Sequence, residues 1–274
     1  MNPLKGACII GQSGGPTAVI NASALGAIQA ALQSEQVTRV LGAANGIEGV
    51  LKERLFDMAR EDPEELELLK YTPASALGSC RYKMAAPSAD DTDYRRLLEI
   101  FRKYNVRYFF YNGGNDSMDT CNKISKFMQQ SGYECRVIGI PKTIDNDLHG
   151  TDHCPGFGSA AKFIATSCME VHQDLRVYDK GRVTIVEIMG RHAGWLAGSA
   201  ALATYAGAGP DLVYLPEVPF RMEEFWQDVD RIYRQNGSCM VAVSEGVQYA
   251  DGRFVAESGD RDVFGHTQLG GLGA

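Results

Sequence analysis

Several patterns that mark special classes of protein are missing from this sequence. Its seven cysteines are scattered over 274 residues, and no two of them stand in Cys-x-x-Cys spacing. An odd and dispersed set of cysteines indicates neither a disulfide framework nor a zinc knuckle. We therefore expect reduced and mostly buried thiols.

Long apolar runs and an excess of positive charge are also absent. No apolar stretch is long enough to span a membrane, and the first residues lead into a strand pattern rather than a signal peptide. The formal net charge of -7 disfavours binding along nucleic acid, because such proteins neutralise phosphates with basic patches. Any anionic substrate must therefore meet a local cluster of cations. These absences favour a cytoplasmic enzyme or binding protein without nucleic-acid or membrane partners.

The sequence does contain an alternation of short apolar strands with helical patterns, and its length suggests about two domains at roughly 150 residues each. The alternation predicts parallel strands with crossover helices, and so an α/β fold with two Rossmann-like three-layer domains. Strands are expected at 7–10, 37–41, 108–111, 136–140, 183–189, 211–215 and 239–244. Helices are expected at 18–33, 63–69, 92–104, 117–130, 156–177, 195–205 and 222–235, with a glycine-rich turn at 46–49.

Two glycine-containing loops each follow a strand pattern and precede a helix. They are Gly11-Gln12-Ser13-Gly14-Gly15 and Gly113-Gly114-Asn115-Asp116-Ser117. In this arrangement backbone N–H groups and a helix N-terminus face one spot, which is a geometry that binds phosphate. Neither loop matches a Walker loop or a dinucleotide-binding fingerprint. The alternatives are a plain tight turn for the first loop and, for the second, a helix N-cap formed by Asn115, Asp116 and Ser117 without a ligand, with Ser117 able to cap the helix.

A lysine and two aspartates lie on one loop directly after the strand pattern at 136–140. Pro141 should end that strand, because proline cannot donate to a sheet ladder. In extended backbone Asp145 and Asp147 point the same way, so one can accept a proton while the other orients a hydroxyl or holds a metal. With Lys142 beside them, these residues favour phosphoryl transfer. The alternative is a polar turn in which both aspartates bond to the backbone.

Arginines supply the local cations that an anionic substrate needs. Arg191 follows the strand pattern at 183–189, and its guanidinium suits bidentate phosphate recognition. Arg182 and Arg81 extend this basic set, although each could equally be a solvated surface charge. His192 could serve as a base, but Asp145 is the stronger candidate.

In combination, Thr143-Ile144-Asp145-Asn146-Asp147 and Met189-Gly190-Arg191 resemble the motifs of the 6-phosphofructokinase family, in particular its pyrophosphate-dependent type. The resemblance covers essentially the whole chain. It implies phosphoryl transfer to the 1-hydroxyl of fructose 6-phosphate, with Asp145 as the base. It also implies that the sugar phosphate is held by Thr143, Asp147, Arg182, Met189, Gly190, Arg191 and Glu245.

Two positions distinguish pyrophosphate from ATP as the phosphoryl donor. Asp116 and Lys142 stand where ATP-using members of the family carry glycine. A carboxylate about 4 Å from a nucleotide phosphate is repelled by about 4 kcal/mol at an effective dielectric of about 20, whereas an ammonium neutralises pyrophosphate. The resemblance then implies pyrophosphate at Gly14, Gly15, Arg81 and Ser117, with Mg²⁺ at Asn115 and Asp116.

The resemblance also implies an organisation for the chain and a place in metabolism. It implies a pyrophosphate domain at 1–155, a smaller fructose 6-phosphate domain at 156–262, and at 263–274 the start of a C-terminal segment that is otherwise missing. Arg182 resembles an arginine that serves a neighbouring subunit, so a homodimer or higher homo-oligomer is expected. The transfer would be reversible, in glycolysis and gluconeogenesis. Because Asn115 replaces an aspartate that many members use for magnesium, a non-catalytic sugar-phosphate-binding regulatory subunit is one alternative, and an ATP-dependent 6-phosphofructokinase is another.

Overall fold

A computed structural model describes residues 4–261 and 267–272 of the chain. The contacts divide the chain into two compact units, Met1–Thr143 and Ile144–Ala274. The domain boundary expected at residue 155 lies within the second of these units. The loop that follows the strand at 136–140 therefore contributes its first residues to one unit and its last residues to the other.

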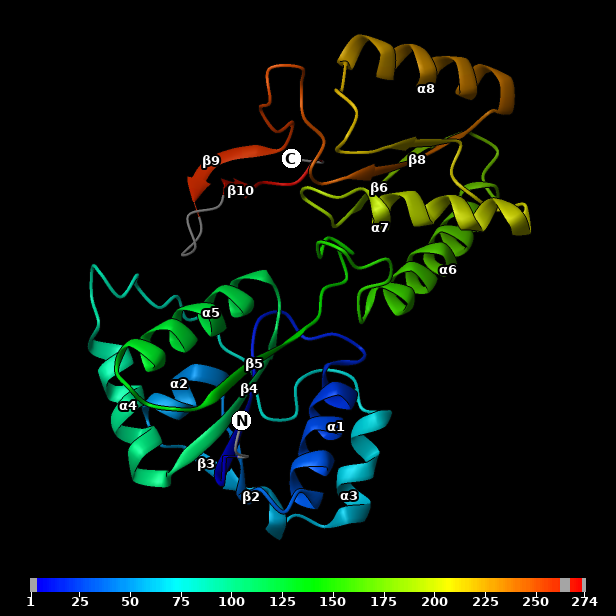
Figure 1. Ribbon diagram of the computed structural model, residues 1–274. Helices are drawn as coiled ribbons and strands as arrows, with labels where there is room; N and C mark the ends of the chain where they lie inside the picture. The colour runs from blue at the N-terminus through cyan, green and yellow to red at the C-terminus, as the bar shows by residue number, and fades with distance from the viewer. Residues whose placement is uncertain (1–3, 262–266, 273–274) are drawn as a thin grey trace. The chain divides into compact units, whose positions relative to one another are not determined.

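The first unit is built on a five-stranded sheet in the order β3-β2-β1-β4-β5 (Figure 1). Every pairing is parallel except that of β2 with β3, which is antiparallel. The expected doubly wound α/β sheet is thus confirmed, with an additional antiparallel edge strand. The strands are β1 (Gly6–Gln12), β2 (Val37–Ala43), β3 (Leu55–Asp57), β4 (Val106–Gly113) and β5 (Arg136–Pro141).

Helices cover both faces of this sheet (Figure 1). Successive side chains of a strand point to opposite faces, and β1 follows this rule. Ala7 and Ile9 pack in one buried cluster with side chains of α2, α4 and α5, while Cys8 and Ile10 pack in another with side chains of α1. The helices are α1 (Ile20–Gln33), α2 (Gly46–Leu51), α3 (Pro63–Glu67), α4 (Thr92–Tyr104) and α5 (Asn115–Gln130), with short 3₁₀ turns at η1 (Met58–Arg60) and η2 (Leu68–Lys70).

The second unit has a three-stranded parallel sheet in the order β6-β8-β7. Met240 and Ala242 of β8 pack with side chains of α6 and α7, whereas Val241 and Val243 pack with side chains of α8. This unit is therefore also three-layered. Its elements are β6 (Val183–Ile188), β7 (Leu212–Tyr214), β8 (Cys239–Ser244), α6 (Phe157–Leu175), α7 (Trp195–Ser199), the 3₁₀ helix η3 (Ala200–Ala206) and α8 (Met222–Asn236).

Two expectations about local structure need correction. The glycines at 46 and 49 belong to α2 and not to a turn. A Cβ at Gly46 would lie 2.7 Å from the Gln12 carbonyl oxygen, so close packing requires glycine there. The helix expected at 195–205 is α only to Ser199 and then tightens into η3. The described part of the expected return segment, β10 (Thr267–Leu269), pairs antiparallel with β9 (Glu257–Arg261), and residues 262–266 lie outside the described part of the chain.

No helix within 4–261 or 267–272 is both long enough and apolar enough to cross a membrane.

Candidate active site

Three segments of the first unit meet where β1, β4 and β5 end. The register pairs Gln12 with Asn112 and Gly113 with Pro141, so these parallel strands end at the same edge of the sheet. The loops are also bonded to each other. The Ser13 amide donates to the Asn112 carbonyl oxygen at 2.8 Å, and the Lys142 amide donates to the Gly113 carbonyl oxygen at 2.9 Å. The expectation that both glycine loops lie on one sheet edge is therefore confirmed.

Glycine is required where these loops approach each other. Gly14 has a φ of +75°, and a Cβ there would lie 3.4 Å from Lys142 Nζ. A Cβ at Gly113 would lie 2.1 Å from Ser117 Oγ and 3.2 Å from the Ser13 carbonyl oxygen. At Gly15, by contrast, a Cβ would meet none of the described atoms within 4 Å. The two loops thus pack against each other at 14 and 113 and leave room beside 15.

Lys142 is a charged side chain that folding buries, since only 5% of its surface is exposed. Its Nζ donates a hydrogen bond to the Gly15 carbonyl oxygen. Burying an ammonium is unfavourable unless it is bonded or paired. The fold therefore holds a positive charge at the first glycine loop, where an anion would be attracted.

The second loop leads into α5, whose N-terminus lies at the same sheet edge. Gly114 is the N-cap residue and no side chain caps the helix, while the Ser117 and Met118 amides both donate to the Gly114 carbonyl oxygen. Ser117 is buried inside the first turn, so the interpretation of Ser117 as the capping residue is wrong; the helix begins two residues earlier. Asn115 and Asp116 are exposed at the start of the helix, where the helix dipole is positive.

Arg81 reaches this edge on an irregular segment. Ser79 Oγ donates to the Gly14 carbonyl oxygen at 2.5 Å, and the Gly14 amide donates to the Cys80 carbonyl oxygen at 3.3 Å. The exposed Arg81 therefore follows directly on residues bonded to the first glycine loop. Tyr111 is buried. Burial raises the pKa of its hydroxyl far above the usual value, so the hydroxyl stays neutral.

In the second unit, the aspartates at 145 and 147 flank a residue with a structural role. Asn146 has a φ of +58° and is only 5% exposed. Its Nδ2 donates to the Asp152 carbonyl oxygen at 3.0 Å, and its Oδ1 accepts from the Cys154 amide at 2.8 Å. The backbone is therefore not extended here, and the expected alternation that would align the two carboxylates does not apply. Asp145 is half-buried, whereas Asp147 is exposed.

The ends of β6 and β8 bring together Gly190, Arg191 and Glu245. Ser244 Oγ donates to the Gly190 carbonyl oxygen at 2.6 Å, and Glu245 Oε1 accepts from the Gly190 amide at 3.2 Å. Gly190 has a φ of +122°, and a Cβ there would lie 2.5 Å from the Ala193 carbonyl oxygen. Arg191 Nε is buried and has no hydrogen-bond partner among the described residues. The backbone beside this arginine is thus held firmly, and its guanidinium retains a donor.

Ser244 was not identified from the sequence, because a serine at a strand end carries no recognisable signal. Met189, an expected sugar-phosphate residue, is 58% exposed beside this turn.

Arg182 is not part of this cluster. It precedes β6, whereas Arg191 follows it, and six residues of strand at about 3.3 Å each separate them by about 20 Å. Its guanidinium carbon lies 3.5 Å from the centroid of the Tyr178 ring. Within one copy of the chain Arg182 and Arg191 therefore lie at opposite ends of β6.

The expected residues are divided between the units. The first holds Gly14, Gly15, Arg81, Asn115, Asp116, Ser117, Lys142 and Thr143, and the second holds Asp145, Asp147, Arg182, Met189, Gly190, Arg191 and Glu245. The expected donor-binding residues thus belong to the first unit, and all the expected sugar-phosphate residues except Thr143 belong to the second.

Asn115 and Asp116 carry the side-chain oxygen atoms that are expected to bind magnesium. Over the described residues, no group of three or more His, Cys, Asp or Glu side chains could hold a metal ion. Mg²⁺, however, usually retains several waters and binds through one or two carboxylates together with substrate phosphates. A single exposed carboxylate with an adjacent amide oxygen fits that mode of binding.

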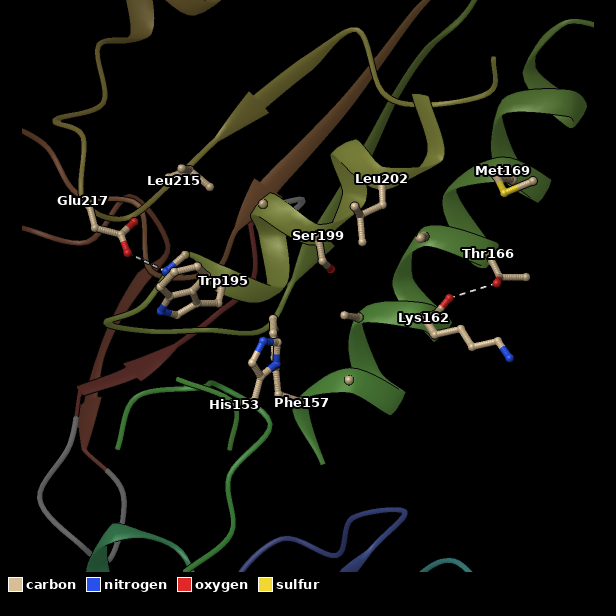
Figure 2. A pocket seen from close by; sticks show the side chains of 15 residues that line it. His153, Phe157, Lys162, Thr166, Met169, Trp195, Ser199, Leu202, Leu215 and Glu217 are labelled. Carbon is tan, nitrogen blue, oxygen red and sulfur yellow. Dashed lines mark hydrogen bonds between the residues drawn. The ribbon is translucent and has the colours of Figure 1, made fainter. Parts of the chain in front are cut away.

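A hollow of about 870 Å³ lies elsewhere in the second unit, between α6 and α7 (Figure 2). Its lining is mainly apolar and includes Phe157, Met169, Trp195 and Leu202. None of the expected site residues lines this cavity. The candidate active site is therefore formed by the charged loops and not by this cavity.

Comparison with known proteins identifies extended similarity. The model of the family described as phosphofructokinase matches residues 7–273. The chain is 48% identical over 265 residues to the pyrophosphate--fructose 6-phosphate 1-phosphotransferase of Halomonas elongata and 49% identical over 265 residues to that of Methylococcus capsulatus. In both cases 95% of this chain is covered.

A solved structure, the pyrophosphate-dependent phosphofructokinase of Nitrosospira multiformis, superposes with a TM-score of 0.82 at 44% identity, covering 90% of this chain and 62% of that one. The chain spans about 63% of the length of the curated relatives it matches.

Proposed function

The chain belongs to the phosphofructokinase family, and from this premise we propose that it transfers a phosphoryl group reversibly between pyrophosphate and the 1-hydroxyl of fructose 6-phosphate. The observation that carries the proposal is the buried Lys142, whose ammonium is bonded to the first glycine loop at the edge where Asp116 lies in the first turn of α5. The names of the relatives at 48% and 49% identity support the same choice of donor.

The charges in the first unit favour a small, highly charged donor. Pyrophosphate concentrates its negative charge in two phosphates, which an ammonium and a helix N-terminus neutralise. A nucleotide adds a third phosphate, and the exposed carboxylate of Asp116 repels it. Because like charges about 4 Å apart at an effective dielectric of about 20 cost about 4 kcal/mol, ATP is disfavoured by nearly three orders of magnitude in affinity.

In the proposed reaction Asp145 accepts the proton of the sugar 1-hydroxyl. The hydroxyl oxygen forms a bond to one phosphorus of pyrophosphate, the bridging P–O bond breaks, and inorganic phosphate leaves. A positioned base contributes about 10²- to 10⁴-fold, so most of the acceleration comes from positioning and from cations. Arg191 would bind the 6-phosphate, with Glu245 fixing the turn that carries it.

Asn115 and Asp116 would hold Mg²⁺ on the pyrophosphate. The ion, when bound, supplies positive charge against the phosphate oxygens. Lys142 contributes charge at the first loop by itself, through its bond to Gly15.

We also propose that the active form is a homodimer or larger homo-oligomer in the cytoplasm. The separation of Arg182 from Arg191 along β6 supports a role for Arg182 at another subunit's site. All seven cysteines are unpaired, as is usual in a reducing compartment. A reversible pyrophosphate enzyme of this kind would serve glycolysis and gluconeogenesis.

A coupled assay with pyrophosphate and fructose 6-phosphate tests the proposal. It should be run on the 274-residue chain and on a version extended to the length of the relatives, because the chain spans about 63% of that length. We expect turnover with pyrophosphate and none with ATP. Turnover with ATP alone would refute the donor assignment and favour an ATP-dependent 6-phosphofructokinase.

Asn115 favours a second candidate function, because its neutral amide is a weaker ligand for magnesium than an aspartate. This candidate is a non-catalytic, sugar-phosphate-binding regulatory subunit. Calorimetry distinguishes the two: binding of fructose 6-phosphate without binding of magnesium pyrophosphate favours the regulatory subunit, and binding of both favours the enzyme.

A further inference from the structure

The segment from Thr72 to Cys80 has no regular secondary structure, yet it is fastened to the sheet by two buried amide side chains. Gln12, the last residue of β1, is 0% exposed, and Asn21, in the first turn of α1, is 1% exposed. Buried amides of this kind are costly unless their hydrogen bonds are satisfied. The hydrogen-bond partners of the two amides therefore show which segments these side chains hold together.

Gln12 uses all four of its hydrogen-bonding positions. Nε2 donates to Asn21 Oδ1 at 3.0 Å and to the Ile20 carbonyl oxygen at 3.3 Å. Oε1 accepts from Ser75 Oγ at 3.0 Å and from the Leu77 amide at 2.9 Å. A glutamine amide has two donors and two main acceptor positions, so one side chain joins α1 to the irregular segment and is fully satisfied.

Asn21 adds two more bonds to the same segment. Its Nδ2 donates to the Thr72 carbonyl oxygen at 2.9 Å, and its Oδ1 accepts from the Ala76 amide at 2.8 Å. Together the two amides hold the segment at four points, which are residues 72, 75, 76 and 77. These bonds fix the backbone course of a segment that has no helix or strand of its own.

The fastened segment continues directly into the candidate donor site. Ser79 and Cys80 are bonded to Gly14, as described above, and Arg81 follows. Residues 78–80 alone separate Leu77, the last fastened residue, from Arg81, and no helix or strand lies between those two residues. The position of Arg81 relative to Gly14 depends on the path that Gln12 and Asn21 impose.

We infer that Gln12 and Asn21 are positioning residues for the phosphoryl donor: they hold 72–80 against β1, so that Arg81 is presented beside the Gly14 loop. The donor part of this inference rests on the proposed function. Neither amide needs to touch the donor. Their loss should loosen the segment and weaken pyrophosphate binding beyond any general loss of stability.

Gln12→Met is the sharpest test, because methionine has nearly the same length and forms none of the four bonds. Ser75→Ala is a milder companion at a partly exposed position. It removes the single hydroxyl hydrogen that Gln12 Oε1 and the Gly78 carbonyl oxygen share, and it leaves the other three bonds of Gln12 in place. Val229→Ala is the matched control, since Val229 is buried on α8 in a cluster that includes none of residues 72–80, so its loss lowers stability without touching the segment. Each variant of the 274-residue chain is measured by amide hydrogen exchange and by calorimetric titration with magnesium pyrophosphate.

We expect Gln12→Met to accelerate exchange of the Ala76 and Leu77 amides about tenfold or more and to weaken pyrophosphate binding about 5- to 30-fold, as the loss of one to two net hydrogen bonds predicts. Ser75→Ala should shift both in the same direction by about two- to fivefold. Val229→Ala should change neither the exchange rates nor the affinity, even when its unfolding midpoint falls as far as that of Gln12→Met.

The inference is overturned if the parent chain binds pyrophosphate and Gln12→Met binds it equally well. It is also overturned if Val229→Ala weakens binding as much as Gln12→Met does. A parent chain that binds no pyrophosphate contradicts the proposed function itself. In that case the exchange rates at 76 and 77 still decide whether Gln12 holds the segment.

Discussion

At the scale of single residues, the molecule concentrates opposite charges around one sheet edge. Lys142 is buried and bonded to Gly15, while Asp116 is exposed at the start of α5. A buried ammonium costs free energy to desolvate unless it is bonded, and the bond to Gly15 holds this positive charge at the edge. The choice between donors should therefore depend on these two side chains.

The double variant Asp116→Gly with Lys142→Gly should admit ATP. Removing the carboxylate removes the repulsion, and removing the ammonium weakens pyrophosphate binding, so we expect ATP affinity to rise about 10²- to 10³-fold. Calorimetric titration with magnesium pyrophosphate and with magnesium ATP measures the change in donor preference. Asp119→Asn, at an exposed position one turn further along α5, is the control and should leave both affinities unchanged. Unaltered ATP binding in the double variant would contradict the charge argument.

Asp145→Asn should lower kcat by about 10²- to 10⁴-fold with little change in KM, because an amide cannot accept the hydroxyl proton. Steady-state kinetics in both directions of the reaction measures this split. The exposed Asp152→Asn is the control, since only the backbone of Asp152 contacts Asn146. A normal kcat in Asp145→Asn would show that Asp145 is not the base.

At the scale of elements, ion pairs lock helix α4 to the turn after α2. Glu53 accepts hydrogen bonds from Lys103, Tyr104 and Arg96. These bonds, with that from Lys103 the largest cause, lower the pKa of the Glu53 carboxyl to about 2. Glu53 also has a φ of +53°, so its side chain secures a turn that is unfavourable for a non-glycine residue.

This lowered pKa predicts an acid-dependent loss of stability. The folded-state pKa lies below the unfolded value of about 4.3, so the contribution is fully present above about pH 4.3 and is lost as pH falls toward about 2. Glu53→Gln should therefore be less stable than the parent chain at pH 7, and the difference should shrink toward pH 2. Urea unfolding at several pH values measures it, with the exposed Glu99→Gln as the control. A difference that is independent of pH would contradict this explanation.

At the scale of the whole molecule, the chain consists of two units that each have a sheet covered by helices on both faces. The expected residues for the donor and nearly all of those for the sugar phosphate fall in different units. Under the proposed function, Arg182, which lies at the opposite end of β6 from Arg191, serves a site on another copy of the chain.

Mixing two inactive variants tests this shared site. If Arg182 serves the neighbouring subunit, a mixed dimer of Arg182→Ala and Asp145→Asn has one intact site and one doubly defective site. Random mixing in a two-fold dimer then restores about one quarter of the parent activity. Each variant alone, refolded in the same way, is the control. No recovery in mixtures that sedimentation shows to be mixed oligomers would place Arg182 at its own subunit's site.

Much of the architecture could be predicted because its signals are local. The strand at 239–244 and the helix at 92–104 have the expected bounds, since both have clear periodicity and flanking breaks. The helix α2 was missed because its two glycines mimic a turn, although Gly46 is required by close contacts with Gln12, Cys80 and Tyr111, which are distant in sequence.

The sequence alone determined the α/β class, the two glycine loops and the set of charged residues, because strand and helix periodicity and loop chemistry are properties of neighbouring residues. Only the tertiary structure decided that Lys142 is buried against Gly15, that Asn146 breaks the extended backbone between the aspartates, and that Ser244 holds Gly190. It also revealed Gln12 and Asn21 as the fastening of 72–80. Those facts depend on hydrogen bonds between residues far apart in the chain, which no local pattern encodes.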